Sequence, residues 1–253
     1  FPGCVDFMDV EVKFTHLNKG DADHASIAAA SIKLLNYADI DPLVLDMNVF
    51  KCSGHDQLWQ GNLEVYDALK EHNMRRLKES GIKILTCSCA ECYRTFAVDY
   101  DLPNTLGIKV EHITQTLQGR GLKFKAPENV TVSYHDPCRL GRMMGEYEAP
   151  RDLIQLVDGA TMVELENNKE RALCCGVSSM MYCNDATKAV RRKRLDQGTD
   201  AGIDIMLGGC PKCYMHMQCM LNEERMNPEE GHHHDYEMMD LMQFLVACLE
   251  DGK

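Results

Sequence analysis

Cysteine motifs follow predicted strands in the same order in both halves of this chain. In the second half, Cys138 follows the apolar segment 130–134, an adjacent Cys-Cys-Gly step occupies 174–176, and a C-x-x-C step at 210–213 follows the apolar segment 203–207. Short apolar strands that alternate with amphipathic helices are typical of β-α-β units around a parallel sheet buried on both faces. The pattern therefore restricts the chain to an α/β fold with an internal repeat.

The first half contains the same order of elements with one change in its cysteine motif. Ser53 stands where the second cysteine of the adjacent pair belongs. In chain order, the first half is predicted to contain Cys4, a helix over 25–37, a strand over 43–45, Cys52, a helix over 62–79, a strand over 82–85, Cys89 and Cys92. The second half is predicted to add helices over 150–157 and 185–197 and a strand over 162–165.

We therefore predict two pseudo-symmetric halves, each with a small parallel sheet and a cysteine site at the carboxyl ends of its strands, where ligands gather in such folds. The halves are predicted to span 1–124 and 125–253, divided near the loop 119–128. The segment 6–24 has no counterpart in the second half, and we expect an insertion there with a hairpin over 10–14. Because the first residue is Phe, we also expect either processing or a missing upstream region, which would add a further N-terminal domain to the full protein.

Charge and composition exclude several classes of function. The net charge of −12 argues against a nucleic-acid partner, which requires a surplus of Lys and Arg. The basic run 191–194 is predicted to be a solvated helix face, with a docking patch for an acidic partner or an anionic substrate as the alternative. The most apolar segment, 238–249, is too short and too polar to span a membrane. The thirteen cysteines without a signal peptide indicate metal or thiol chemistry in a reducing compartment, so we expect a cytoplasmic protein.

The five cysteines of the second half are candidate ligands of one inorganic centre. An adjacent cysteine pair does not easily close on itself as a disulfide, and a C-x-x-C step can direct two thiolates at one centre. Four thiolates suffice for zinc or for a cubane iron–sulfur cluster, so a zinc site that uses four of the five stays open. Gly176 removes a side chain where the centre approaches the backbone.

Three segments of the second half resemble the CCG domain of the heterodisulfide reductase family. They are His135-Asp136-Pro137-Cys138, Cys174-Cys175-Gly176 and Gly209-Cys210-Pro211-Lys212-Cys213-Tyr214. The family includes the related subunit of the sulfite-reduction-linked membrane complex and iron–sulfur subunits of glycolate, lactate and glycerol-phosphate oxidation. The resemblance implies a noncubane [4Fe–4S] cluster held by Cys138, Cys174, Cys175, Cys210 and Cys213, at which a disulfide substrate is cleaved.

In the first half, four cysteines match the usual complement of a cubane [4Fe–4S] cluster that relays electrons. They are Cys4, Cys52, Cys89 and Cys92. Two alternatives stay open: Cys87 serves as a fifth ligand, or the site binds nothing.

Polar residues near the cysteines are further candidates. His135 and His55 can hydrogen-bond a cluster sulfur or donate a proton to a leaving thiolate, or they cap loops. Arg139, Arg142 and Lys212 can offset cluster charge or meet an anionic substrate. We predict that Cys183, Cys219 and Cys248 are core thiols and that the histidine tract 232–234 is a solvated loop, with a metal tract as the alternative.

We predict an enzyme, the catalytic subunit of a heterodisulfide-reductase-like complex that reduces a disulfide or trisulfide carried by a small molecule or a protein. The predicted partners are an electron-donating iron–sulfur or flavin subunit and a membrane subunit that holds the protein at the inner face of the membrane. One alternative is the electron-transfer subunit of a hydroxy-acid or glycerol-phosphate dehydrogenase. The other is a zinc-stabilised binding module.

Overall fold

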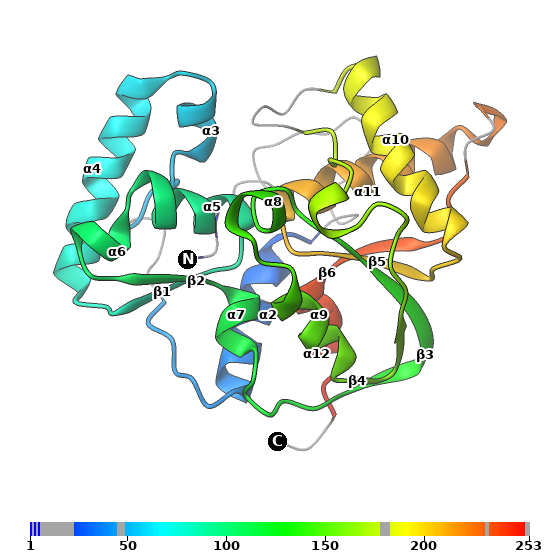
Figure 1. The fold of residues 1–253 in the computed structure, drawn as a ribbon, viewed down its shortest axis with the longest axis horizontal. Coiled ribbons are helices and arrows are strands. Elements are labelled where there is room, and N and C mark those ends of the chain that lie inside the picture. The colour runs from blue at the N-terminus through cyan, green and yellow to red at the C-terminus, as the bar shows by residue number, and fades with distance from the viewer. Residues whose placement is uncertain are drawn as a thin grey trace.

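The computed structural model describes residues 1, 3, 5, 23–44, 49–177, 183–230 and 233–250. It has an α/β architecture with two small parallel sheets, which confirms the predicted fold class (Figure 1). The predicted ligand Cys4 and the predicted hairpin over 10–14 lie outside the described residues. The boundary between residues 124 and 125 stays a prediction. Among the described helices, none combines the length and the apolar character needed to cross a membrane.

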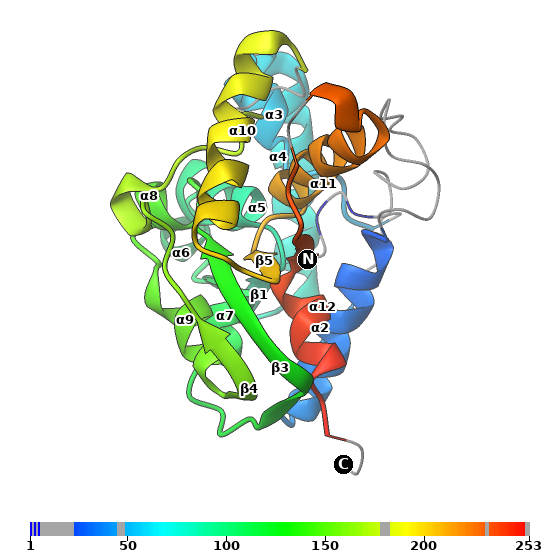
Figure 2. The same cartoon turned by 90° about the vertical axis from the view of Figure 1, so that its right-hand side faces the viewer.

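The larger sheet has four parallel strands in the order β4-β3-β5-β6. Their bounds are β3 Phe124–His135, β4 Val157–Met162, β5 Ile205–Gly208 and β6 Glu237–Asp240. Successive side chains of a strand point to opposite faces, and both faces of β5 are buried. Met206 belongs to the core under α10 (Asp185–Asp200) and α11 (Pro211–Met226), whereas Leu207 belongs to the core under α2 (Ala25–Tyr37) and α12 (Leu241–Ala247). Figure 2 shows α2 and α12 side by side on one face of this sheet.

The smaller sheet consists of two parallel strands, β1 (Ile84–Cys87) and β2 (Lys109–His112). The helices of this region are α3 His55–Trp59, α4 Leu63–Ser80, α5 Ala90–Arg94, α6 Leu102–Thr105 and α7 Ile113–Leu117, with a π-helical turn over Thr95–Asp99. The remaining helices, α8 (Gly141–Met144) and α9 (Glu148–Gln155), and the short 3-10 turns Lys169–Arg171 and Pro228–Glu230 belong to the second half.

The same order of elements occurs in both halves of the chain. β1 leads into the C-x-x-C helix α5, and β5 leads into the C-x-x-C helix α11. The next strand in each half, β2 or β6, ends at a buried residue that caps the following short helix, His112 in one half and Asp240 in the other. Each cap forms a capping box with a glutamine three residues on. Neither β2 nor β6 was predicted from the sequence, because their segments Lys-Val-Glu-His and Glu-Met-Met-Asp are too polar to form an apolar run.

Two predicted strands differ from the structure. Leu43 and Val44 are exposed and irregular, so the predicted strand over 43–45 is wrong at these residues; a short apolar segment forms no strand without a partner strand. The strand predicted over 162–165 lies earlier in the chain. It is β4, which occupies 157–162 just after α9 and shares only residue 162 with the predicted range. The helix predicted over 25–37 is confirmed, but it packs on the sheet of the second half.

Candidate metal centre

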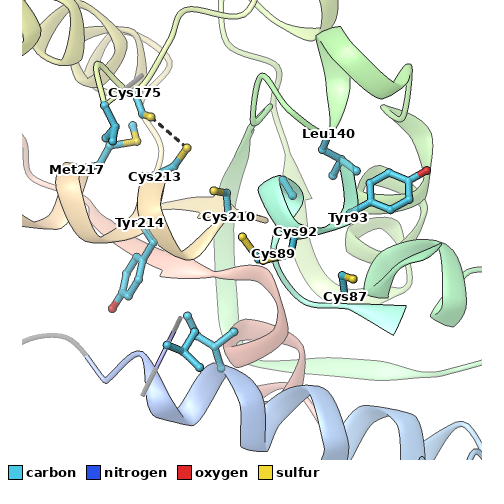
Figure 3. Packing of buried hydrophobic residues seen from close by; sticks show 14 of the residues in the cluster. Cys87, Cys89, Cys92, Tyr93, Leu140, Cys175, Cys210, Cys213, Tyr214 and Met217 are labelled. Carbon is cyan, nitrogen blue, oxygen red and sulfur yellow. Dashed lines mark hydrogen bonds between the residues drawn. The ribbon is translucent and has the colours of Figure 1, made fainter. Parts of the chain in front are cut away.

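The C-x-x-C step of the second half lies at the start of α11. Cys210 is the N-cap residue, separated from β5 by Gly209, and Cys213 lies in the first turn. The Sγ of Cys213 lies 3.1 Å from the Sγ of Cys175 (Figure 3). All three side chains are buried. The fold thus joins the C-x-x-C step to the Cys-Cys-Gly step, 35 residues apart in sequence, at one point.

The other two cysteines extend this group toward the surface. Cys138, in the loop after β3, is in hydrogen-bonding contact with Cys174, and both are half-buried. The five cysteines predicted as ligands in the second half therefore form one connected group, called the second set here: Cys138, Cys174, Cys175, Cys210 and Cys213. None of these five is joined in a disulfide.

The protonation of the second set favours a bound cation. Contact with the Cys174 side chain, together with burial, raises the pKa of Cys175 to about 12. Contacts with Cys175 and Cys210, again with burial, raise the pKa of Cys213 well above its ordinary value. Thiols packed in this way do not ionise together unless a metal takes their negative charge. The donor set therefore fits a thiolate-ligated metal group.

The first half repeats this geometry with one oxygen in place of a sulfur. Cys89 is the N-cap of α5 and Cys92 lies in its first turn. Ser53 places its Oγ 3.4 Å from the Sγ of Cys92, just as Cys175 faces Cys213. Cys52, Ser53, Cys89 and Cys92 are called the first set here. Ser53 thus occupies the position of the missing thiol.

The two glycine turns beside the cysteines have the same conformation. Gly54 and Gly176 have φ values of 81° and 77°, and each amide N lies 3.4 Å from the sulfur of the cysteine two residues earlier. A Cβ at Gly176 would overlap the carbonyl oxygen of Thr187. Both the positive φ and the close approach of α10 therefore require glycine at this position.

The first and second sets meet in the interior. Cys89 and Cys210, which hold equivalent positions in the two halves, are in hydrogen-bonding contact, and Figure 3 shows Cys210 between Cys213 and Cys89. Cys87 is fully buried in β1, where burial raises its pKa to about 12. Sequence reasoning assigned one site to each half and had no signal for this contact between them.

Lys212 links the two halves by buried ion pairs. Its Nζ lies 2.5 Å from Asp56 and 2.8 Å from Glu91, both in the first half. Burial disfavours the ammonium, but the two carboxylates more than offset this and hold the pKa of Lys212 above its ordinary value. The sequence indicated that Lys212 offsets cluster charge or meets an anionic substrate. In the structure its charge is paired with two carboxylates of the first half. Glu91 and Lys212 hold equivalent positions in the two C-x-x-C steps.

The two candidate histidines have different surroundings. A ring nitrogen of His135 and the sulfur atoms of Cys175 and Cys213 all lie within 4.8 Å of one another. Burial, with the charge of Arg194, lowers the pKa of His135 to about 3. His55 instead shares a 3.0 Å hydrogen bond between its Nδ1 and the hydroxyl of Thr95, and its Nε2 lies 3.6 Å from Glu91. His135 is therefore the histidine that lies beside the second set.

The predicted solvated face over 191–194 is wrong at two residues. Arg191 and Arg194 are fully buried against the second set, whereas Lys193 is exposed and Arg192 pairs with Glu224. Positions i and i+3 share one face of a helix, so the spacing places both arginines on the same side of α10, and the elements packed against that side bury them.

Two other candidate arginines have protein partners. The guanidinium of Arg139 stacks on the ring of Trp59 at 3.8 Å, and Arg142 donates a hydrogen bond of 2.5 Å to the carbonyl of Ala172. Arg139 therefore joins the loop after Cys138 to α3 of the first half.

Three predictions outside the site are corrected or confirmed. His234 is buried between Glu224 and Asp196, because two carboxylates neutralise it, so the solvated-loop prediction is wrong for this residue. Cys183 is exposed and is not a core thiol, because it lies just outside α10. Cys219 and Cys248 are buried, as predicted.

Comparison with known proteins identifies the domain. The family model described as CCG, cysteine-rich domain, matches residues 16–97 and 132–218. The chain is 32% identical over 213 residues to a subunit of dihydromethanophenazine:CoB–CoM heterodisulfide reductase of Methanosarcina barkeri, covering 80% of this chain and 52% of that protein. It is 28% identical over 202 residues to the probable iron-sulfur-binding oxidoreductase FadF of Bacillus subtilis, covering 77% of this chain and 28% of that protein. It is 27% identical over 208 residues to EtfAB:quinone oxidoreductase of Syntrophomonas wolfei, covering 76% of this chain and 28% of that protein.

The chain spans about half the length of the curated heterodisulfide reductase subunits that it matches. The names of the relatives describe oxidoreductases and iron–sulfur-binding proteins, which agrees with the connected thiols of the two sets. The two matched segments correspond to the two repeats in the structure. The chain belongs to the CCG cysteine-rich domain family and carries two copies of the domain.

Proposed function

We propose that this chain is an iron–sulfur oxidoreductase subunit that reduces a disulfide or trisulfide at a noncubane [4Fe–4S] cluster held by the second set. The observation that carries the proposal is the connected group of five cysteines, set beside a first set in which Ser53 replaces the equivalent thiol. When bound, the cluster supplies single electrons and an iron site for a substrate sulfur. Splitting a disulfide into two thiols consumes two electrons and two protons.

The chain's own residues hold this site in place and balance its charge. Asp136, two residues before Cys138, accepts hydrogen bonds of 2.7 and 3.0 Å from Arg151 and one of 2.8 Å from the amide of Lys169. These bonds fix the loop that carries His135 and Cys138. The buried cations Arg191 and Arg194 offset negative charge on the thiolates.

We propose that the first set, with Cys4, holds a [4Fe–4S] cluster that relays electrons. Four cysteines are the usual complement of a cubane cluster, and the hydroxyl of Ser53 is a weaker iron ligand than a thiolate. The contact between Cys89 and Cys210 supports electron transfer directly between the two sets. The electron donor is proposed to be an iron–sulfur or flavin subunit, because relatives are named as subunits of oxidoreductases.

Analysis of metal content and EPR tests the proposal. The chain, purified or reconstituted without oxygen, is expected to contain iron and acid-labile sulfide, and to give a thiol-dependent paramagnetic signal on oxidation. The signal is expected to disappear in Cys175→Ser and to persist in Cys248→Ser, which changes a buried cysteine outside both sets. Zinc in place of iron would support the binding-module alternative and refute the redox assignment.

A second function is favoured by one observation. The similarity to EtfAB:quinone oxidoreductase supports an electron-transfer subunit of a flavin-linked dehydrogenase with no sulfur substrate. In that case the clusters would be reduced by a flavoprotein partner, and thiol addition would leave the EPR spectrum of the second set unchanged. The same experiment therefore separates the two functions.

A further inference from the structure

Arg194 is a buried cation without a carboxylate partner among the described residues. It is fully buried and donates three hydrogen bonds, from Nε to the Nδ1 of His135 at 3.0 Å and from Nη1 to the carbonyl of Asn167 at 2.6 Å and the Oε1 of Gln197 at 2.9 Å. Burial lowers its pKa to about 10, which still leaves the guanidinium charged at neutral pH. A buried charge that no carboxylate neutralises is costly, so an anionic group beside it is expected.

The hydrogen bond from Arg194 decides which nitrogen of His135 carries the proton. A guanidinium can only donate, so Nδ1 of His135 must accept. The proton of the neutral ring is therefore on Nε2. This Nε2 is buried and has no hydrogen-bond partner in the described part of the chain. A ring nitrogen of His135 lies within 4.8 Å of the sulfur atoms of Cys175 and Cys213, so the ring that carries this unused N–H borders the second set.

The same arrangement occurs once more on α10. Arg191, one turn earlier, donates from Nη2 to the Nδ1 of His216 at 3.3 Å and from Nε to the carbonyl of Cys175 at 3.1 Å. Both inward-facing arginines of the helix thus bind a histidine Nδ1 instead of a carboxylate. The repetition indicates that the cations are placed to hold histidine tautomers and to face the thiols of the second set.

We propose that Arg194 is a positioning residue that fixes the Nε2–H of His135 as a hydrogen-bond donor to a sulfur atom of the second centre. The proposal rests on the proposed function, since it requires a bound cluster. Hydrogen bonds to cluster sulfurs stabilise the more negative, reduced state and raise the reduction potential. Arg194 therefore acts in two ways, through its charge and through the proton that it keeps on Nε2.

A double-mutant cycle separates these two effects. The midpoint potential of the second centre is measured by EPR-monitored titration of the reconstituted full chain in the wild type, Arg194→Met, His135→Ala and the double variant. We expect Arg194→Met to lower the potential more than Lys193→Met, which removes the same charge from an exposed neighbour on α10. In the His135→Ala background the effect of Arg194→Met is expected to shrink to the charge effect alone. Equal shifts in both backgrounds would overturn the proposal.

A second measurement holds even if Arg194→Met fails to fold. The amide of Gln places an N–H near the position of Nε2, whereas the amide of Asn replaces Nδ1. Electron–nuclear double resonance in H₂O and D₂O is expected to detect an exchangeable proton coupled to the second centre in the wild type and in His135→Gln, but not in His135→Asn or His135→Ala. A coupling that survives in His135→Ala would refute the assignment. Wild-type protein without iron or sulfide would overturn both proposals, whereas a normal cluster with additive potential shifts would overturn only this one.

Discussion

Replacing Lys212 by Met is expected to destabilise the chain strongly, because it leaves a buried carboxylate without its partner. The Lys212 side chain is 4% exposed and that of Glu91 is 11% exposed, while Asp56, at 32%, can regain water. Removing one member of a buried ion pair costs about 3–5 kcal/mol. For a chain of this size each kcal/mol lowers the melting temperature by about 2–4 °C, so a drop of roughly 6–20 °C is expected.

Thermal unfolding followed by circular dichroism under anaerobic conditions measures this drop. The matched control is Lys109→Met, which removes an ion pair of similar length, 2.6 Å, from a lysine that is 71% exposed. It is expected to change the melting temperature little, because exposed pairs contribute little. In a Glu91→Gln background, Lys212→Met should cost much less, since no buried carboxylate is then left unpaired. If Lys212→Met were as mild as the control, or equally costly in both backgrounds, the reasoning would be refuted.

Three other predictions test the glycine turn, the buried histidine and the serine substitution. Gly176→Ala should destabilise the fold by at least about 1 kcal/mol and lower the iron content, because the added Cβ would meet Thr187 and the φ of residue 176 is 77°. Iron analysis and thermal unfolding measure the two effects, and wild-type iron content with a wild-type melting temperature would contradict the prediction. The two carboxylates beside His234 raise its pKa against the effect of burial. The protonated ring therefore stabilises the fold fully at a pH below the pKa of about 6.5 that His has in the unfolded chain, and this stabilisation is lost as the pH rises through the higher pKa of the folded state. Melting temperatures from pH 6 to 9 should therefore fall more in the wild type than in His234→Gln, and parallel curves would exclude the effect. Ser53→Cys should give the first set four thiols, five together with Cys4, and add a second signal of the noncubane type to the EPR spectrum; an unchanged spectrum would show that the first set does not hold a cluster at this position.

Short-range patterns account for most of the correct predictions. The helix over 25–37 follows from its own periodicity, and the grouping of the second-half cysteines follows from their places after strands β3 and β5. The rest depended on contacts that no local pattern encodes. Burial of Arg191 and Arg194 depends on what packs against α10, and the meeting of Cys89 with Cys210 depends on how one half faces the other. At Leu43 and Val44 a local pattern was misleading: the apolar segment predicted a strand, but these residues are exposed and pair with no neighbouring strand.

The pairing of Glu91 with Lys212 has a consequence for how such a chain can arise and be altered. Because these residues hold equivalent positions and touch each other, two identical copies of either repeat would bring like charges together at this point: two carboxylates from the first, two ammonium groups from the second. If one copy was duplicated, the residue at this position in one of the two repeats would have to change its charge before the repeats could pack together as they do in this structure. Chimeras that replace one copy with the other should fail to assemble unless this residue is changed as well.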